Sequence, residues 1–196
     1  MFFFAKTLIY LYAVGLAMII ALGGRAGSGK STIAKAVAKK LGYRHYSMGD
    51  LQRQIAKEKG ISLLELGKLE ENDDSFDREL DRKQKELGEK EDNFVIDGRL
   101  SAFFIPNALK IFLDADPTTR AERILKDRRE MEQSKDLKAM LKSIKQREAS
   151  ENKRYKTYYG FDCYDPRHYD TVIDSTSLSV EEVVASVLAL AKKRRL

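Results

Sequence analysis

The stretch Gly24-Arg25-Ala26-Gly27-Ser28-Gly29-Lys30-Ser31, followed by Thr32, decides the fold of this chain. It fits the pattern G-x-x-x-x-G-K-S/T without a mismatch, and this pattern is typical of a phosphate-binding loop. Glycines allow the backbone to curl so that several N–H groups point at one phosphate chain, and a helix that begins at Lys30 adds the positive end of its dipole. We predict that residues 24–32 bind the phosphates of ATP, with Lys30 bridging the β- and γ-phosphates and the Ser31 hydroxyl as a ligand of Mg²⁺.

The segments on either side of this loop predict a parallel sheet. An unbroken apolar run at 18–23 is typical of a buried strand, and apolar side chains recur at helical spacing over 30–41. Further strands are expected at 43–47, 94–97, 110–114 and 171–174, and helices near 49–59, 62–70, 74–87 and 180–193. Pro117 is expected to open another helix, and a charged helical stretch runs from there to about 158. Buried strands that alternate with helices form a parallel sheet covered on both faces. The expected fold is therefore α/β, the three-layer P-loop nucleoside-triphosphate hydrolase fold, with a five-stranded parallel sheet and helices on both faces.

Length and composition are those of one globular domain, with 196 residues of which 43% are hydrophobic and 34% charged. Because Cys163 is the only cysteine, an internal disulfide and a Cys-rich metal site are excluded. The net charge of +6 favours acidic ligands such as nucleic acid, acidic lipid or polyphosphate. Between Arg120 and Arg154, twelve Lys and Arg residues oppose seven Asp and Glu residues, so most of the excess charge lies in one helical region.

Residues 8–22 form an apolar run that is similar to a signal peptide or a membrane anchor. The last third of that run is needed as the strand before the phosphate loop, and residues 1–17 alone are shorter than the roughly 20 residues that span a bilayer. We therefore expect residues 1–17 to be a non-essential extension and residues 18–196 to form a single domain. A membrane-tethering peptide is the alternative interpretation of residues 1–17.

Charged side chains follow the other predicted strands, and ligands of parallel sheets bind at this carboxyl edge. Arg53, in a helix that starts after Ser47, could reach an acceptor phosphate, although an Asp-capped helix with a surface arginine gives the same pattern. Asp97-Gly98-Arg99 ends an apolar strand. Here Asp97 could hold Mg²⁺ through water, Gly98 would leave room for substrate, and Arg99 would contact phosphate. A plain turn after the strand is the alternative.

Two further groups lie in the basic helical region. Arg147, Glu151 and Arg154 share one helical face, which could line a site or could be a stripe of salt bridges. Arg128 and Arg129 begin a polar segment, about 128–143, of the kind that forms a mobile lid and brings cations over a transferring phosphate.

No Ser/His/Asp or Cys/His set is evident in the sequence. His45 and His168 lack metal-ligand spacing and are expected to be surface or hydrogen-bonded residues. Transfer from one phosphate to another needs no general base, because the acceptor phosphate is already anionic at pH 7. Positioning and charge neutralisation are then sufficient.

With these residues in place, the chain resembles the cytidylate kinase family of nucleoside monophosphate kinases over nearly all of residues 18–191. The similar strings are 24–32, 47–53, 97–99, 110–114, 120–123, 144–148 and 172–175. Their order and spacing, together with the string at 77–82, are most similar to the compact archaeal-type members of that family.

The resemblance implies a cytoplasmic, monomeric phosphotransferase that uses ATP and Mg²⁺ to convert CMP or dCMP into CDP or dCDP, with small-molecule nucleotides as partners and neither nucleic acid nor a membrane. It also implies a segment at about 48–90 that binds the nucleoside monophosphate, and the lid at about 128–143. By similarity, Ser47 would lie near the acceptor base, Arg53 and Arg99 would hold its phosphate, and Arg147, Glu151 and Arg154 would face its sugar and base. Asp97 is also expected among the substrate-binding residues. The catalytic groups would be Lys30, Asp97, Arg128 and Arg129, with Ser31 and Asp97 on the metal.

Two departures from the family pattern affect the expected base. Leu100 stands where common bacterial members carry an aspartate that helps to read cytosine, and Met48 stands where adenylate kinases carry threonine. CMP and dCMP remain the expected acceptors, with UMP or AMP as alternatives.

Two other classes of protein compete with this interpretation. A kinase of a non-nucleotide small molecule, such as shikimate or gluconate, would need an acid that activates a hydroxyl and would need fewer arginines. A basic nucleic-acid-binding protein would interleave aromatic rings with its Lys and Arg side chains. The aromatic candidates for that role are Phe103, Phe104, Tyr155, Tyr158 and Tyr159.

Overall fold

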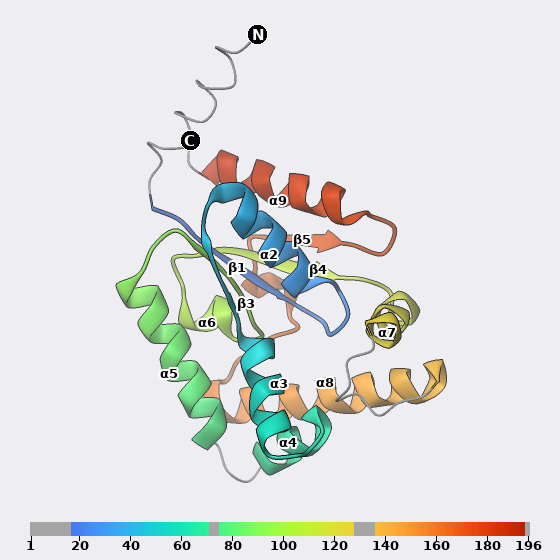
Figure 1. The fold of residues 1–196 in the computed structure, drawn as a ribbon. Coiled ribbons are helices and arrows are strands. Elements are labelled where there is room, and N and C mark those ends of the chain that lie inside the picture. Colours follow the sequence, from blue (N-terminus) through green and yellow to red (C-terminus); the bar gives the residue numbers. More distant parts are fainter. Residues whose placement is uncertain (1–16, 71–74, 128–135, 195–196) are drawn as a thin grey trace, which may run out of the picture.

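The computed structural model, which describes residues 17–70, 75–127 and 136–194, contains one sheet of five parallel strands (Figure 1). The strands are β1 (Ile19–Gly24), β2 (Arg44–Ser47), β3 (Phe94–Asp97), β4 (Leu109–Asp114) and β5 (Thr171–Asp174). Their order is β2-β3-β1-β4-β5, so the strand that leads into the phosphate loop lies at the centre. The predicted five-stranded parallel sheet is confirmed.

The longer helices lie in the predicted places. The helices are α2 (Lys30–Leu41), α3 (Met48–Glu58), α4 (Leu63–Glu70), α5 (Ser75–Lys90), α6 (Ser101–Phe104), α7 (Pro117–Lys126), α8 (Leu137–Tyr159), the 3₁₀ helix η1 (Pro166–His168) and α9 (Val180–Arg194). The short α6 and η1 were not expected. The helical stretch predicted from 117 to about 158 contains α7, which ends at Lys126, and α8. The Asp136 side chain caps α8 by accepting a hydrogen bond from the Ala139 N–H.

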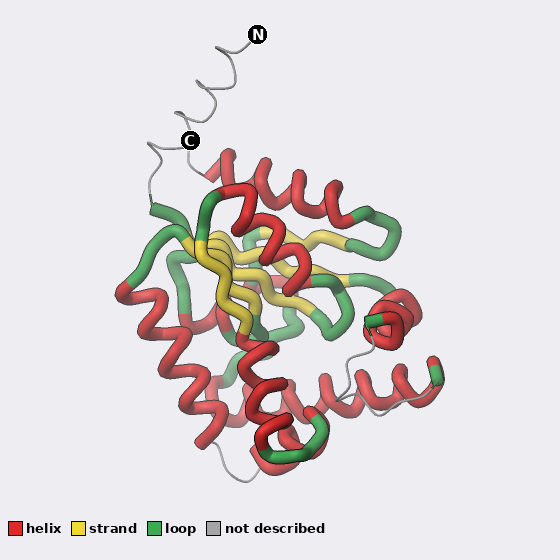
Figure 2. The backbone as a smooth tube through the Cα atoms, in the orientation of Figure 1, coloured by secondary structure: helices red, strands yellow, loops and turns green. Residues whose placement is uncertain are grey.

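Different helices cover the two faces of the sheet (Figure 2). Side chains alternate along β1, so Ile20 and Leu22 pack with residues of α2 and α9. Ile19 and Ala21 point the other way and belong to a second cluster, which includes Ile105 and is packed against by Leu87 of α5 and Phe104 of α6. This alternation gives the three-layer arrangement that the sequence predicts for a buried parallel sheet.

The remaining helices α3, α4, α7 and α8 gather beyond the carboxyl ends of the strands (Figure 1). The Ser47 side chain caps α3 by accepting a hydrogen bond from the Asp50 N–H, and α8 packs against both α4 and α7. These helices therefore enclose the edge of the sheet at which ligands of parallel sheets bind.

Residues 1–16, most of the predicted N-terminal extension, lie outside the described part of the chain. Among residues 17–70, 75–127 and 136–194, no helix has the length and apolar character needed to cross a membrane.

Candidate active site

The phosphate loop connects the central strand β1 to α2, and its glycines are required by geometry. Gly24 has φ +131°, and a Cβ there would lie 2.0 Å from the carbonyl oxygen of Leu113. Gly27 has φ +78°, and a Cβ there would lie 2.4 Å from the carbonyl oxygen of Arg120. No larger residue fits either position, so the sequence pattern follows from the tight turn as well as from the expected phosphate.

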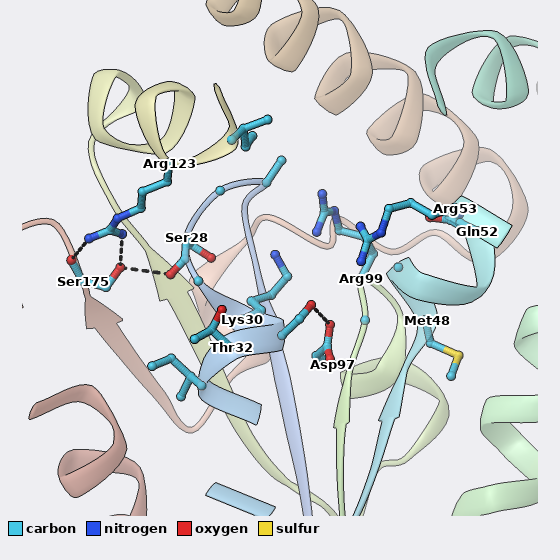
Figure 3. Close-up of a pocket in the computed structure, with 18 of the residues that line it drawn as sticks. Ser28, Lys30, Thr32, Met48, Gln52, Arg53, Asp97, Arg99, Arg123 and Ser175 are labelled. Carbon is cyan, nitrogen blue, oxygen red and sulfur yellow. Dashed lines mark hydrogen bonds between the residues drawn. The ribbon is translucent and has the colours of Figure 1, made fainter. Parts of the chain in front are cut away.

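A cavity of about 280 Å³ opens beside this loop. Its walls are residues 26–33 of the loop and α2, the start of α3, residues 97–100 after β3, and side chains from α5, α7, α8 and the turn before α9. Figure 3 shows Lys30 of α2, Arg53 of α3, and Asp97 and Arg99 at the end of β3 grouped around this space. The structure thus brings together at one site the loop and the charged residues that follow the strands.

The carboxylate of Asp97 is held from three sides. Its Oδ1 accepts hydrogen bonds from the Ser31 hydroxyl at 2.8 Å and from the Ser47 hydroxyl at 3.2 Å. The Oδ2 atom lies 2.8 Å from Nε2 of His45. Asp97 and Ser31, the two residues predicted to share a metal, are therefore adjacent, and His45 is a hydrogen-bonded residue as expected. Its place beside Asp97 was not predicted.

Arg99 and Arg147, which both line the cavity, share a single carboxylate. Nε of Arg99 lies 2.8 Å from Oε2 of Glu151, and Nε of Arg147 lies 3.0 Å from Oε1 of the same group. The Tyr164 hydroxyl also donates to Glu151, and a second Arg99 nitrogen donates to the Gly24 carbonyl oxygen at 3.0 Å. Glu151 thus fixes two guanidinium groups beside the phosphate loop.

These contacts change the protonation equilibria of the site. Burial, aided by the nearby Arg99 guanidinium, lowers the pKa of Lys30 well below its ordinary value. Burial disfavours the charges of both Arg99 and Glu151. At Glu151 the combined effect of Arg99, Arg147 and the Tyr164 hydrogen bond outweighs burial and lowers the pKa, and at Arg99 the nearby Glu151 and Tyr164 together raise the pKa. Burial also raises the pKa of Tyr164, which keeps its hydroxyl protonated as a donor.

The other predicted site residues lie in different environments. Arg53 lines the cavity and forms an ion pair with Asp50 one turn earlier in α3. Arg154 is buried, and its guanidinium donates to the Gly67 carbonyl oxygen at 2.9 Å. With Glu151 it borders a separate cavity of about 10 Å³ rather than the main one. Arg128 and Arg129 lie outside the described residues, so their predicted place over the ATP phosphates stays a prediction.

Two supports of the phosphate loop were missed by the sequence analysis. Glu148 accepts a hydrogen bond from Arg25 at 2.8 Å and one from Arg120 at 2.6 Å, which ties the loop to α7 and α8. Ser175, just after β5, donates to the Ser28 carbonyl oxygen at 3.0 Å and accepts a hydrogen bond from Arg123 at 3.0 Å (Figure 3). The signal for Ser175 was available, because it follows a strand at the ligand-binding edge.

Gly98 lines the cavity and is also required for packing. A Cβ at this position would lie 2.5 Å from the Ser101 hydroxyl and 3.0 Å from Cγ of Met48. The Cβ side of Gly98 is therefore occupied by Ser101 and Met48, and whether the glycine also leaves room for substrate stays a prediction.

Comparisons with known proteins agree with this geometry. The model of the cytidylate kinase-like family matches residues 19–177. A cytidylate kinase of Archaeoglobus fulgidus is 39% identical over 180 residues, which are 91% of this chain and 97% of the relative. A cytidylate kinase of Pyrococcus abyssi is 41% identical over 88% of this chain and 92% of the relative.

Among solved structures, shikimate kinase from Bacteroides thetaiotaomicron has a TM-score of 0.63 and 19% identity, over 90% of this chain and 99% of that one. This likeness shows the P-loop kinase fold alone. The family match and the two curated relatives establish the family as well as the fold: the chain belongs to the cytidylate kinase-like family.

Proposed function

We propose that the protein transfers the γ-phosphoryl group of ATP to CMP, and to dCMP, with ADP and CDP or dCDP as products. The observation that carries the proposal is that Arg53, Arg99 and Arg147 line the same cavity as Lys30 and the phosphate loop. A triphosphate binder needs the loop alone, whereas three additional guanidinium groups supply the charge to hold a second phosphate. The cytidylate kinases that are 39% and 41% identical to this chain support the choice of acceptor.

The ATP phosphates would lie in the loop at 24–32. The Ser28 hydroxyl is buried there and, among the residues described, has no hydrogen-bond partner, which fits a loop completed by a ligand. A bound triphosphate would also favour the charged form of Lys30, whose pKa is lowered in the free protein.

Ser31 and Asp97 would hold Mg²⁺. Hydroxyl and carboxylate oxygens are the hard ligands that this ion prefers, and the Ser31 hydroxyl already lies 2.8 Å from Asp97 Oδ1. When bound, the ion would neutralise charge on the β- and γ-phosphates. Ser47 and His45 would keep the Asp97 carboxylate turned toward the loop, since both contact its oxygens.

The acceptor phosphate would be bound by Arg53 and Arg99, with Arg147 beside it. Glu151 would position Arg99 and Arg147, because a carboxylate that holds two guanidinium groups reduces the freedom each would lose on binding phosphate. The predicted contacts of Ser47, Glu151 and Arg154 with the acceptor base and sugar stay predictions. Arg128 and Arg129, within a lid at about 128–143, would add charge at the transferring phosphate.

Catalysis in this arrangement rests on alignment and charge. A phosphate oxygen of the acceptor attacks the γ-phosphorus in line, and the bond to the ADP oxygen breaks as the new one forms. Lys30 and the arginines would stabilise the charge that spreads over the transferred group, and no residue has to remove a proton. The substrate ATP points to a cytoplasmic enzyme, and a monomer is expected because both sites lie within one chain.

A coupled assay of ADP release tests the reaction class. With ATP and Mg²⁺, we expect turnover with CMP and dCMP above UMP, AMP and GMP, and none with shikimate or gluconate. Removal of Mg²⁺ by EDTA should abolish it. Turnover with none of the monophosphates would refute the proposal, and greater turnover with AMP than with CMP would keep the reaction but change the acceptor.

A further inference from the structure

We propose that Asp81 and Gln84 read the base of the acceptor and select cytosine over uracil, an inference that rests on the proposed function. Both side chains come from α5, whose described charged neighbours Arg82, Lys83 and Lys85 are exposed. Asp81 is only 6% exposed and Gln84 only 3%, yet both line the cavity that contains Lys30 and Arg99. Burying a polar side chain costs free energy unless it is hydrogen-bonded, so the hydrogen-bond partners of Asp81 and Gln84 indicate what these side chains can bind.

The carboxamide of Gln84 is oriented by Ser101. The buried Ser101 hydroxyl donates to Gln84 Oε1 at 2.7 Å, which directs the amide nitrogen the other way. That nitrogen, Nε2, carries two N–H groups and lies 3.4 Å from Asp81 Oδ1. One N–H serves Asp81 weakly, and among the described residues no partner is seen for the second N–H, which can donate to a ligand acceptor. Gly98 permits this arrangement, because a side chain there would displace the Ser101 hydroxyl.

The carboxylate of Asp81 is fixed by a neighbour as well. The Tyr159 hydroxyl donates to its Oδ2 atom, while Oδ1 faces Gln84. An ionised carboxylate has about four acceptor sites, so Asp81 can accept a hydrogen bond from a ligand in addition to those from its protein partners. Asp81 and Gln84 therefore form an adjacent pair in which one group accepts hydrogen bonds and the other donates them.

This pair matches cytosine and opposes uracil. The edge of cytosine carries N3, an acceptor, beside the 4-amino group, a donor, which would meet the Gln84 amide and the Asp81 carboxylate. Uracil carries N3–H and O4 in the same places, so it would set a donor against the amide and an acceptor against the carboxylate. Adenine repeats the cytosine pattern with N1 and its 6-amino group. Its exclusion must come from space, and Met48, Leu80, Leu100 and Tyr155 provide the apolar walls.

The pair also accounts for Leu100. A leucine at this buried, cavity-lining position cannot hydrogen-bond a base. Asp81 supplies the carboxylate from α5 instead, so cytosine recognition does not require an acid at position 100.

The test is the ratio of kcat/KM for CMP to kcat/KM for UMP in Asp81→Asn. The amide offers uracil O4 a donor, so the ratio should fall about 10- to 100-fold, as for the loss of one well-placed base contact. The KM for ATP should stay within about twofold, since Asp81 would not touch the donor. The matched control is Glu89→Gln, which removes one exposed charge from the same helix and should leave the ratio unchanged.

Two further measurements keep the test decisive if Asp81→Asn folds poorly. Gln84→Met removes the donor at similar volume and should lower the same ratio about 10-fold. With the wild-type protein, a CMP analogue with hydrogen in place of the 4-amino group should lose about 10- to 100-fold in kcat/KM. The base-reading role of Asp81 and Gln84 is overturned if the wild type phosphorylates CMP, both variants keep its CMP-to-UMP ratio, and the analogue keeps the kcat/KM of CMP. The proposed function would stand in that case. A wild type that phosphorylates no pyrimidine monophosphate overturns the proposed function instead.

Discussion

Glu151 on α8 lies 2.8 Å from Arg99 at the end of β3, and 52 residues of chain separate them. Arg147 shares the same carboxylate, and the side chains of Glu151 and Arg99 are largely buried. A buried carboxylate between two guanidinium groups is costly to remove, because its loss takes a close counter-charge from both largely buried arginine side chains.

Glu151→Gln should therefore lower the free energy of unfolding at pH 7 by about 3 kcal/mol. Because Arg99 and Arg147 lower the pKa of Glu151, the wild type keeps this stabilisation above the ordinary glutamate pKa of about 4.3 and loses it as the pH falls further. Denaturant unfolding at pH 7 and pH 4 measures both effects. The variant should lose less stability on acidification than the wild type. If Glu151→Gln and the exposed Glu89→Gln lower the free energy of unfolding equally, Glu151 does not stabilise the fold through these two arginines.

Lys30→Met should separate catalysis from stability. The variant should lose at least about 10²- to 10³-fold in kcat, because the ammonium group stabilises the transferring phosphate. Its unfolding free energy at pH 7 should equal or exceed that of the wild type. Burial lowers the pKa of Lys30, so its charge opposes folding at neutral pH, and this cost fades as the pH rises toward the unfolded value of about 10.4.

The control for Lys30→Met is Lys35→Met, an exposed lysine of the same helix, for which activity and stability should both stay near the wild type. A clear loss of stability in Lys30→Met would mean that its charge is compensated in the free protein.

Arg53→Ala should raise the KM for CMP about 10- to 100-fold, since a charge-assisted contact with phosphate contributes about 1.5–3 kcal/mol. The KM for ATP should change by less than about twofold. Arg82→Ala removes a guanidinium from an exposed ion pair with Glu86 and should alter neither constant. Equal effects of Arg53→Ala on both substrates would place Arg53 outside the acceptor site.

Gly27→Ala tests the close approach beneath the phosphate loop. A Cβ at Gly27 would lie 2.4 Å from the Arg120 carbonyl oxygen, whereas Gly60 has a similar positive φ with no atom within 4 Å of an added Cβ. Gly60→Ala should therefore cost only the backbone strain of about 1–2 kcal/mol. Gly27→Ala should cost more and weaken ATP binding, as measured by denaturant unfolding and by titration with ATP. Equal costs would show that the loop adapts to the methyl group.

Much of the site could be predicted from the residues that follow each strand in the sequence. Lys30, Asp97 and Arg99 were expected near one another because carboxyl ends of parallel strands share an edge, and the structure places them around one cavity. The contact of His45 with Asp97 depends on the register in which His45 lies opposite Val95, and Ser47 opposite Asp97, in β2 and β3. A single sequence does not specify that register.

Helical spacing in the sequence predicts which side chains share one face of a helix, but not which residues those side chains contact. Arg147 and Arg154 do lie on one side of α8, as their spacing predicts. Arg147 faces the main cavity, while Arg154 donates to the Gly67 carbonyl oxygen of α4. Which neighbour each side chain meets depends on how α8 packs against α4, and this packing involves residues far apart in the sequence.

The central claim is that the acceptor of the phosphoryl group is the phosphate of CMP. Incubation with CMP, Mg²⁺ and ATP labelled at the γ-phosphate, followed by separation of the nucleotides, tests it directly. We predict one labelled CDP for each ADP formed, with the label in the β-phosphate of CDP. Label recovered only in inorganic phosphate, with CMP unchanged, would contradict the claim.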